Sequence, residues 1–495
     1  MICGFEEYLV ETKSIYDLIA NCFGVLCSNI RNQEAFVGEY MSKGSGAINN
    51  PNLDRLKHFS QKIREIMKEY EASDYDKTKA QILEAIEGLE IENYLDEKKN
   101  HLTVIYCILV AIDSKAMEWS TRWMQPKLGP LDENGKTGYR VYFSPRDTLH
   151  EQFVDGVKRK RVGPSNFFEC FTNFRFVKEK SWEKDIAVPQ IQYVSLPAYV
   201  KKEFKEVRKL KIAVIPCCRE RHFDFVPTRG AGLKVEYLSE VQEKIGERIC
   251  DHIEKSIDQG AHIIILPEYT TSPVISKMIK KCLRKMQFEK SESSKLLLVF
   301  AGTMWTEDDN NVMQILDVYG RVLGEYYKYS AFTKGKEEGY SFEQTESLSD
   351  PGKRCDLIGL EGIGVILPAV CRDVIDGVYT EEVAKMLLPV LVAIAAWSPS
   401  VASFEPRLED YANKHFTSAV LCNACSSVNA KSRKIGAGSI VAKKGSIAKA
   451  ELKSIDRTNC QLHCKSMTCV YFLEYDFSFE ADVKNTQLTC DRYGT

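Results

Sequence analysis

The chain contains the run Gly362-Ile363-Gly364-Val365-Ile366-Leu367-Pro368-Ala369-Val370-Cys371-Arg372-Asp373. Its apolar residues predict a buried strand, and this strand ends on a thiol that is followed by two charges. The last side chain of a strand lies at the rim of a sheet, where the active sites of α/β folds gather. Taken alone, a cysteine in this position is usually a small core residue. Cys371 is nevertheless the first candidate for a reactive group.

Two segments upstream end in the same way. Ile263–Leu266 is apolar and leads through Pro267 to Glu268, and the pair Tyr326-Tyr327 precedes Lys328. Three predicted strands therefore each present one reactive group, in the order Glu, Lys, Cys. This order is more informative than any of the three residues by itself.

Helices alternate with apolar strands from Leu210 onward, which predicts an α/β core with a covered sheet. Residues 1 to about 124 predict helices instead, because apolar residues recur there at helical spacing, as in Asn52–Glu71. Short strands are expected within residues 138–198, and Lys201–Lys209 predicts a helical linker. We therefore expect two domains, a mainly helical one at residues 1–205 and an α/β one at residues 206–495.

Composition places the chain among ordinary globular proteins. At 495 residues it is too long for one compact core, and its hydrophobic and charged shares are 44% and 27%. A net charge of -2 gives no general attraction to nucleic acid or acidic lipid. The two longest apolar stretches, His101–Ile112 and Met386–Trp397, are shorter than the ~20 residues that span a membrane. Seventeen scattered cysteines without a secretory signal favour a reducing, cytoplasmic location.

Several motifs occur in one order along residues 209–475. They are the strand Lys211–Pro216, Leu266-Pro267-Glu268, the block Asn311–Lys328 with its glycine turn, Gly364–Asp373, Trp397-Ser398-Pro399, and Cys422-Asn423-Ala424 followed by Gly436–Ile440. This ordered set resembles the nitrilase (carbon–nitrogen hydrolase) superfamily. Residues 1–205 carry no such resemblance. The resemblance implies a four-layer α-β-β-α sandwich that assembles into dimers or larger homo-oligomers.

The resemblance also implies roles for the three strand-end residues. Cys371 would be the nucleophile, Glu268 the general base, and Lys328 the cation that stabilises the tetrahedral intermediate. A free thiol has a pKa near ~8.5 and needs such a base to react at neutral pH. The products would be an acid and ammonia or an amine, released through a thioester acyl-enzyme. No metal or organic cofactor is required.

A second glutamate is expected about eight residues after the lysine, where this chain has Lys336. Glu337 and Glu338 follow, and Gly339-Tyr340 favours Glu338 because it resembles the amidase branch. The choice between the two glutamates stays open. The substrate is expected to contact Tyr269, Arg372, Trp397 and Glu337.

Amides are expected before nitriles, because most members of the superfamily resemble amidases. A different hypothesis is an oligomeric scaffold, sensor or immunity effector that keeps the fold for assembly. In a third, ammonia passes to a partner synthetase on another chain. Residues 1–205 would then bind a protein partner or regulate access.

Two further motifs offer weaker alternatives. Cys460, His463 and Cys464 could belong to a zinc knuckle, but a Cys-x-x-Cys pair is missing. The basic run Lys158–Arg161 precedes an aromatic segment, a combination that can bind single-stranded nucleic acid. A solvated loop beside a half-buried strand is the simpler interpretation, so we expect no nucleic-acid partner.

Overall fold

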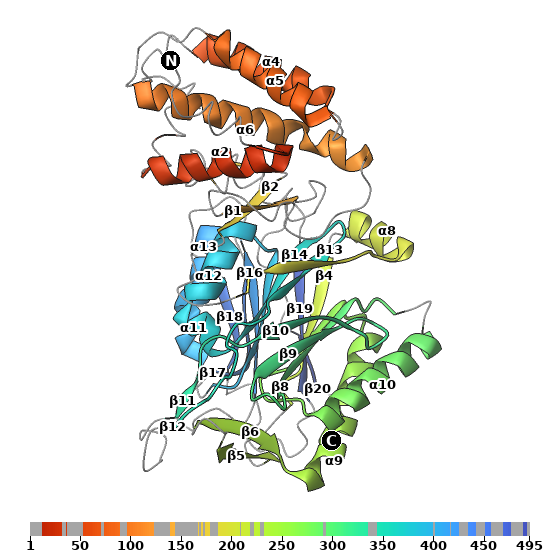
Figure 1. The fold of residues 1–495 in the computed structure, drawn as a ribbon. Coiled ribbons are helices and arrows are strands. Elements are labelled where there is room, and N and C mark those ends of the chain that lie inside the picture. The colour runs from red at the N-terminus through yellow and green to blue at the C-terminus, as the bar shows by residue number, and fades with distance from the viewer. Residues whose placement is uncertain are drawn as a thin grey trace. The chain divides into compact units, whose positions relative to one another are not determined.

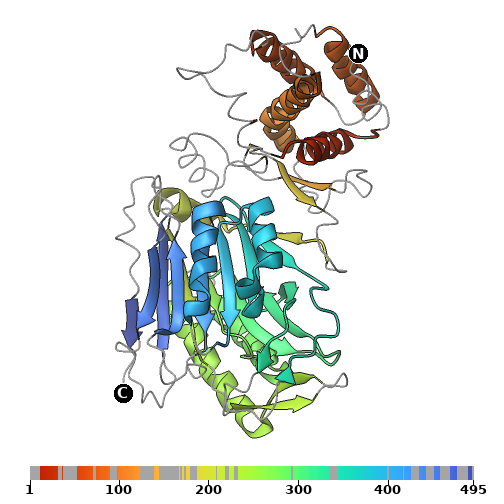
Figure 2. The same ribbon diagram turned by 90° about the vertical axis from the view of Figure 1, so that its left-hand side faces the viewer.

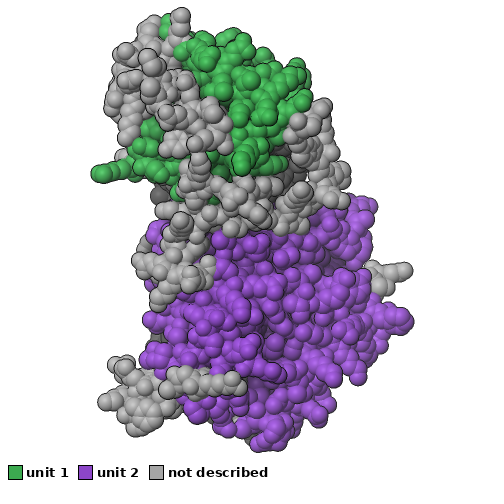
Figure 3. Space-filling view, in the orientation of Figure 1, with its two compact units in different colours: residues 1–151, 155–183 green, residues 152–154, 184–495 purple. Residues whose placement is uncertain are grey.

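The computed structural model divides the chain into two compact units, residues 1–151 with 155–183 and residues 152–154 with 184–495 (Figure 3). The residues that it describes are 12–31, 36, 53–70, 74–89, 97–122, 139–143, 167, 170–171, 174–178, 187–207, 209–217, 222–227, 232–290, 294–334, 344–398, 401–415, 417–424, 434–441, 451–456, 469–476 and 489–492.

The first unit contains helices and one antiparallel strand pair. Its elements are α2 (Ile15–Asn29), α4 (Leu53–Lys68), α5 (Tyr75–Glu87), α6 (Glu97–Arg122), β1 (Tyr139–Phe143) and β2 (Phe174–Lys178). Aromatic rings fill its core, and the rings of Phe23 and Phe176 stack with their centroids 3.7 Å apart. The buried Asp113 carboxylate accepts a hydrogen bond from the Phe174 N–H at 3.0 Å, which ties α6 to β2.

The second unit is built on two seven-stranded sheets (Figures 1 and 2). The first sheet has the order β10 (Val322–Tyr327), β9 (Asn311–Leu316), β8 (Leu298–Trp305), β7 (Ile263–Ile265), β4 (Lys209–Val214), β19 (Cys469–Asp476), β20 (Thr489–Arg492). The second has the order β18 (Glu451–Asp456), β17 (Lys434–Val441), β16 (Ser418–Asn423), β15 (Leu391–Ala396), β14 (Gly364–Val370), β13 (Asp356–Leu360), β3 (Gln190–Val194). The predicted mixed α/β class is confirmed.

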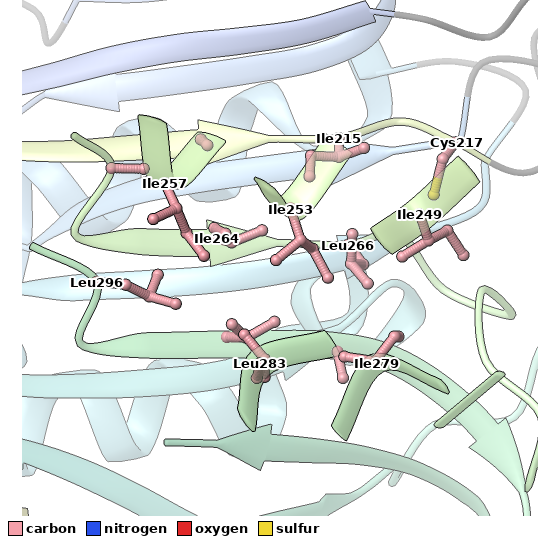
Figure 4. Packing of buried hydrophobic residues seen from close by; sticks show 14 of the residues in the cluster. Ile215, Cys217, Ile249, Ile253, Ile257, Ile264, Leu266, Ile279, Leu283 and Leu296 are labelled. Carbon is pink, nitrogen blue, oxygen red and sulfur yellow. The ribbon is translucent and has the colours of Figure 1, made fainter. Parts of the chain in front are cut away.

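Helices cover the sheets of this unit (Figures 1 and 2). Helices α9 (Ser239–Asp258) and α10 (Pro273–Lys290) pack on the first sheet, whereas α11 (Arg372–Asp376), α12 (Val378–Leu387) and α13 (Glu405–His415) pack on the second. Figure 4 shows side chains such as Ile253 of α9 and Leu283 of α10 beside Ile264 of β7. These isoleucines and leucines are fully buried, so the strand that leads to Glu268 lies in a dry core.

Smaller elements complete this unit. They are α8 (Ala198–Val207), the hairpin of β5 (Phe223–Pro227) and β6 (Leu233–Tyr237), the pair β11 (Thr333–Lys334) and β12 (Gln344–Thr345), and the short 3-10 turn Val401–Ser403. Among the helices of the described residues, none is both long enough and apolar enough to cross a membrane.

The division into units differs from the boundary that the sequence suggested at residue 205. Strand β3 pairs in parallel with β13, and the Gln190 N–H donates to the Cys355 carbonyl at 2.9 Å. Segment 190–207 therefore belongs to the second unit. The sequence does not reveal this pairing, because β3 and its partner lie more than 160 residues apart along the chain.

Candidate active site

Three strand ends bring Glu268, Lys328 and Cys371 together. Glu268 follows β7 after Leu266 and Pro267, Lys328 directly follows β10, and Cys371 directly follows β14. Their exposed fractions are 1%, 1% and 4%. The first two follow strands of one sheet and the third follows a strand of the other, so both sheets contribute to the site.

An ammonium lies between two carboxylates at the centre of the site. Lys328 Nζ donates to Glu268 Oε1 at 2.8 Å and to Glu346 Oε2 at 2.5 Å. The Cys371 thiol and the Glu268 carboxylate are close enough for each to shift the pKa of the other. The structure thus places the sulfur, the Glu268 carboxylate and the Lys328 amine in one connected group.

Asn311 at the start of β9 links the two carboxylates. Its Nδ2 donates to Glu268 Oε1 at 3.2 Å and to Glu346 Oε1 at 3.0 Å, and the residue has no exposed surface. The Lys328 N–H donates to the Asn311 carbonyl at 3.0 Å, so one residue fixes both the carboxylates and the backbone of the lysine. Asn311 opened the block that carried the family resemblance, but no role had been assigned to it.

Glu346 is the residue that the sequence reasoning missed. It stands 18 residues after Lys328, beyond the expected spacing of about eight, and immediately after β12. Its backbone pairs with Phe332, and its carboxylate also accepts from the Phe332 N–H at 2.9 Å. The two glutamates considered from the sequence, Glu337 and Glu338, lie outside the described residues. No apolar run precedes Glu346, so the strand-end signal that marked the other three residues is absent there.

A tight turn after β7 sets the direction of Glu268. Tyr269 has a φ of 57°, and its N–H donates to Thr303 Oγ1 at 3.0 Å. Thr270 Oγ1 donates to the Pro267 carbonyl at 2.6 Å. Gly302 lets β8 approach this turn, because a Cβ at that position would lie 2.3 Å from the Pro267 oxygen. The residues on either side of Glu268, Pro267 and Tyr269, are therefore both fixed by hydrogen bonds, which sets the direction of the Glu268 carboxylate.

Cys371 occupies a strained backbone conformation between β14 and α11. Its φ is 39° and its ψ is -101°, a region that costs a residue with a Cβ roughly 1–3 kcal/mol. Its N–H donates to the Ala395 carbonyl at 2.9 Å, and Sγ lies 3.9 Å from the Trp397 carbonyl oxygen. Strain of this kind gathers at functional sites, where the surrounding structure holds a side chain in a required direction.

Asp373 joins the nucleophile segment to the lysine segment. Its carboxylate accepts from the Tyr326 hydroxyl at 2.9 Å and from the Tyr329 N–H at 3.1 Å, and also from the Ser330 N–H. Burial raises the pKa of Asp373 to about 7, although these donors and Lys328 act in the opposite direction. The positions of Cys371 and Lys328 are therefore coupled through a buried carboxyl group.

The electrostatics of the site favour a protonated resting thiol. Burial raises the pKa of Cys371 well above its usual value, and the nearby Glu268 carboxylate adds to this rise. Burial also raises the pKa of Glu268, with Glu346 adding to the effect and Lys328 opposing it. Burial lowers the pKa of Lys328, but the two carboxylates outweigh burial and raise that pKa well above its ordinary range. Lys328 is therefore a permanent cation, and Glu268 has a raised affinity for a proton.

The residues expected to contact substrate fall into two groups. Tyr269 and Trp397 lie at the site, with ring centroids 5.5 Å apart, and the Tyr269 ring lies 5.8 Å from Lys328 Nζ. The Arg372 side chain is instead half-exposed and bonds to Asp376 at 2.8 Å on its own helix. Only the backbone N–H of Arg372, which begins α11, adjoins Cys371.

A small pocket adjoins the site. A water-sized group finds only about 10 Å³ of space in it, and its wall contains Glu346 and Tyr269. The hairpin β5–β6 forms part of the wall, and the ring centroid of Phe225 lies 5.7 Å from that of Trp397. The pocket therefore shares Glu346 and Tyr269 with the site, and most of its other wall residues are apolar.

The weaker alternatives receive no support in the described part of the chain. Cys460, His463 and Cys464 lie outside it, and within it no group of three or more His, Cys, Asp or Glu side chains could hold a metal ion. The basic run Lys158–Arg161 also lies outside it. Of the aromatic residues that follow, Phe167, Phe171 and Phe174 are buried in the core of the first unit, where they cannot stack on bases.

The sequence matches no protein-family model and no curated protein. The solved structures that match part of this chain include members of the nitrilase superfamily. The glutamine-dependent NAD+ synthetase from Acinetobacter baumannii is 15% identical over 54% of this chain, with a TM-score of 0.35. This chain spans only 46% of that synthetase.

Two smaller proteins are covered almost completely. An amidase from Nesterenkonia sp. is 15% identical over 52% of this chain and 93% of its own, with a TM-score of 0.32. Nit3 from Saccharomyces cerevisiae, a member of branch 10 of the nitrilase superfamily, is 15% identical over 52% and 96%, also with a TM-score of 0.32. At these identities and TM-scores the likeness covers about half of the chain and assigns no activity to it.

Proposed function

We propose that this protein is a carbon–nitrogen hydrolase that cleaves an amide through a thioester on Cys371. The observation that carries the proposal is that Cys371, Glu268 and Lys328 are buried at adjoining strand ends, with Lys328 Nζ bonded to Glu268 Oε1 at 2.8 Å. A thiol beside a base and a fixed cation is an arrangement for nucleophilic attack on a carbonyl carbon. The proposal includes a four-layer α-β-β-α sandwich for the second unit, with assembly into homo-oligomers.

The first half of the reaction forms the acyl-enzyme. The Cys371 sulfur bonds to the carbonyl carbon while its proton passes to Glu268, and the carbonyl oxygen takes the negative charge. An ammonium has three N–H bonds. Lys328 uses two of them on Glu268 and Glu346, so one is left for the oxyanion or the departing nitrogen. Glu268 then returns the proton to the nitrogen, the C–N bond breaks, and ammonia or an amine leaves.

The second half releases the acid. Glu268, again unprotonated, takes a proton from a water molecule that attacks the thioester carbon. The C–S bond breaks, and the proton returns to the Cys371 sulfur. The raised pKa of Glu268 suits both halves, because it makes the carboxylate a stronger base toward the thiol and the water than an ordinary glutamate.

Glu346 acts in this proposal by positioning Lys328. It accepts a hydrogen bond from the ammonium and is itself fixed by the Tyr269 hydroxyl at 3.2 Å and the Phe332 N–H. Replacing it with glutamine leaves the ammonium with one carboxylate and lets it move. A displacement of about 1 Å in such a site can lower the rate by about 10²-fold.

The test measures ammonia released from a panel of small amides by the full-length protein. We expect Cys371→Ala to reduce release to background and Glu346→Gln to lower kcat by about 10²-fold. Cys282→Ala is the matched control, because Cys282 is a partly buried cysteine on α10, outside the site. Mass spectrometry should find the acyl group on Cys371. Equal release by wild type and Cys371→Ala would contradict the proposal and favour a scaffold.

A further inference from the structure

The two helices that cover the first sheet, α9 and α10, approach each other closely at a glycine. A Cβ at Gly246 of α9 would lie 2.4 Å from the sulfur of Met278 on α10, so the absence of a side chain at residue 246 permits this contact. Nearer their ends the helices are joined by an ion pair, in which Lys290 Nζ lies 3.6 Å from Glu254 Oε1. The spacing between the two helices is therefore held at more than one point along their length.

One helical turn beyond this contact, each helix carries a cysteine. Cys250 follows Gly246 by four residues, and Cys282 follows Met278 by four, so each cysteine lies on the same helix face as the residue one turn before it. Cys282 Sγ lies 3.8 Å from the Cys250 carbonyl oxygen. The two thiols are also close enough for each to shift the pKa of the other. Cys250 and Cys282 therefore face each other across the contact between the helices.

Both thiols of this pair are accessible from solvent. Cys250 and Cys282 are partly exposed. The other described cysteines of the second unit are all buried: Cys217, Cys355, Cys371 and Cys422. Reactive cysteines are partly exposed thiols, whereas buried structural cysteines are inert. A small oxidant in solution therefore reaches Cys250 and Cys282 more readily than it reaches the buried thiols of this unit.

The two thiols differ in acidity. The neighbouring Cys250 holds the pKa of Cys282 below its usual value, and the cation Lys285 acts in the same direction, although burial and Glu254 oppose them. The pKa of Cys250 is raised instead, by Cys282 and by burial. The thiolate is the form of cysteine that attacks an oxidant. Cys282 is therefore suited to react first and Cys250 to react second.

We propose that Cys250 and Cys282 form a redox-active dithiol, which a peroxide oxidises to a disulfide between α9 and α10. The Cys282 thiolate attacks a peroxide oxygen, so that an S–O bond forms, the O–O bond breaks, and the hydroxide that leaves takes the proton lost by Cys282. The Cys250 sulfur then attacks the Cys282 sulfur. The S–S bond forms, the S–O bond breaks, and the second hydroxide takes the Cys250 proton. The two thiols lose two electrons, and hydrogen peroxide is reduced to two water molecules.

The disulfide closes a loop of the chain that contains β7 and Glu268. Residues 250–282 run from α9 through β7 and the turn after it to α10. A covalent link across such a loop lowers the entropy of the unfolded chain, which stabilises the folded state. Oxidation therefore strengthens the helical layer over the first sheet, and a thiol reductant reverses the change. This modification site is separate from the candidate active site and does not rest on the proposed function.

The test treats the reduced full-length protein with a small excess of hydrogen peroxide and then blocks the remaining thiols with iodoacetamide. Mass spectrometry of tryptic peptides should find residues 249–255 linked to residues 282–284, and dithiothreitol should separate them. Oxidation should also raise the melting temperature by about 5 °C. Cys282→Ser should show neither effect. Cys27→Ser, at a partly exposed cysteine of the first unit, is the matched control and should show both.

Peptide mapping of the wild type decides the proposal even where Cys282→Ser folds poorly. Linkage of Cys250 to Cys282 supports it. Three results would overturn it: both thiols still alkylated after peroxide, either thiol joined to another cysteine, or Cys282 oxidised to a sulfinic acid without a disulfide. An equal rise in melting temperature for the wild type and Cys282→Ser would overturn the stabilising role of the disulfide.

Discussion

The charge balance around Lys328 determines how the site can work. Two buried carboxylates share one ammonium, and excess buried negative charge is costly in a dry interior. The raised pKa of Glu268 is the consequence, because burial and Glu346 both disfavour its charged form. A proton that leaves the Cys371 thiol therefore has a ready acceptor, which a carboxyl group in water would not provide.

The stability of the fold depends on pH through the buried His262. Burial lowers the pKa of His262 to about 4, and its Nδ1 accepts from the Lys211 N–H at 2.8 Å, a bond that protonation would break. In the unfolded chain His262 therefore binds a proton as the pH falls through about 6.5, whereas in the folded chain it does so only near pH 4. The stability contributed by neutral His262 is complete above about pH 6.5 and is lost as the pH falls toward 4.

We expect His262→Asn to remove this dependence, because the asparagine amide oxygen can accept from the Lys211 N–H without titrating. Between pH 7.5 and 5.5 the wild type should lose about 1.4 kcal/mol more unfolding free energy than the variant. Urea unfolding at both pH values measures the difference. His58→Asn, at an exposed histidine on α4, should behave as the wild type. Parallel losses in wild type and His262→Asn would contradict the expectation.

The sequence could indicate three of the four titratable site residues for a physical reason. Glu268, Lys328 and Cys371 each end an apolar strand, and an apolar run is visible without a structure. Glu346 follows the two-residue strand β12, and its partner Lys328 is 18 residues away. Such a contact depends on how the intervening segment returns to the site.

At the scale of elements, the turn after β7 depends on a glycine of the neighbouring strand. Gly302 has a φ of 69°, and a Cβ there would lie 2.3 Å from the Pro267 carbonyl and 3.0 Å from Thr270 Cβ. The first of these neighbours is backbone and cannot move without moving Glu268. Gly362, with a φ of 75°, has nothing within 4 Å of the same position. Both positions would strain the backbone of an alanine, but only residue 302 would also produce a steric clash. Comparing alanine at the two positions therefore distinguishes the two effects.

We expect Gly302→Ala to reduce both stability and hydrolysis. The left-handed conformation costs an alanine roughly 1–2 kcal/mol at either position. Only at residue 302 does the clash also displace the Pro267–Tyr269 turn, so kcat should fall by about 10²-fold there. Gly362→Ala should lower the melting temperature slightly and keep wild-type kcat. Thermal unfolding and ammonia release measure the two effects, and equal kcat in the two variants would contradict this account of the turn.

Long elements could be predicted from the sequence, whereas short ones could not. Helix α4 matches the expected segment Asn52–Glu71 to within a few residues, because its apolar face repeats at helical spacing. The hairpin β5–β6 was not expected, although it forms much of the pocket wall. Its strands have five residues each and are partly exposed, so they lack a continuous apolar pattern.

At the scale of the whole molecule, the boundary between the units decides which fragments can fold. Strand β3 covers the edge of β13, and α8 places Val200 and Phe204 in buried positions of the second unit. An uncovered edge strand leaves backbone N–H and C=O groups unpaired and promotes pairing between molecules. The segment 190–207, which the sequence assigned to the N-terminal domain, is therefore expected to be essential to the α/β unit.

We expect a fragment of residues 184–495 to fold and one of residues 208–495 to be impaired. Both lack the first unit, so the comparison isolates β3 and α8. The shorter fragment should melt at least about 5 °C lower or aggregate, because it loses a strand and several buried apolar side chains. Circular dichroism melting and light scattering measure these outcomes. Equal melting temperatures would instead support a boundary near residue 205, and β3 would then be a peripheral strand that the two sheets do not need.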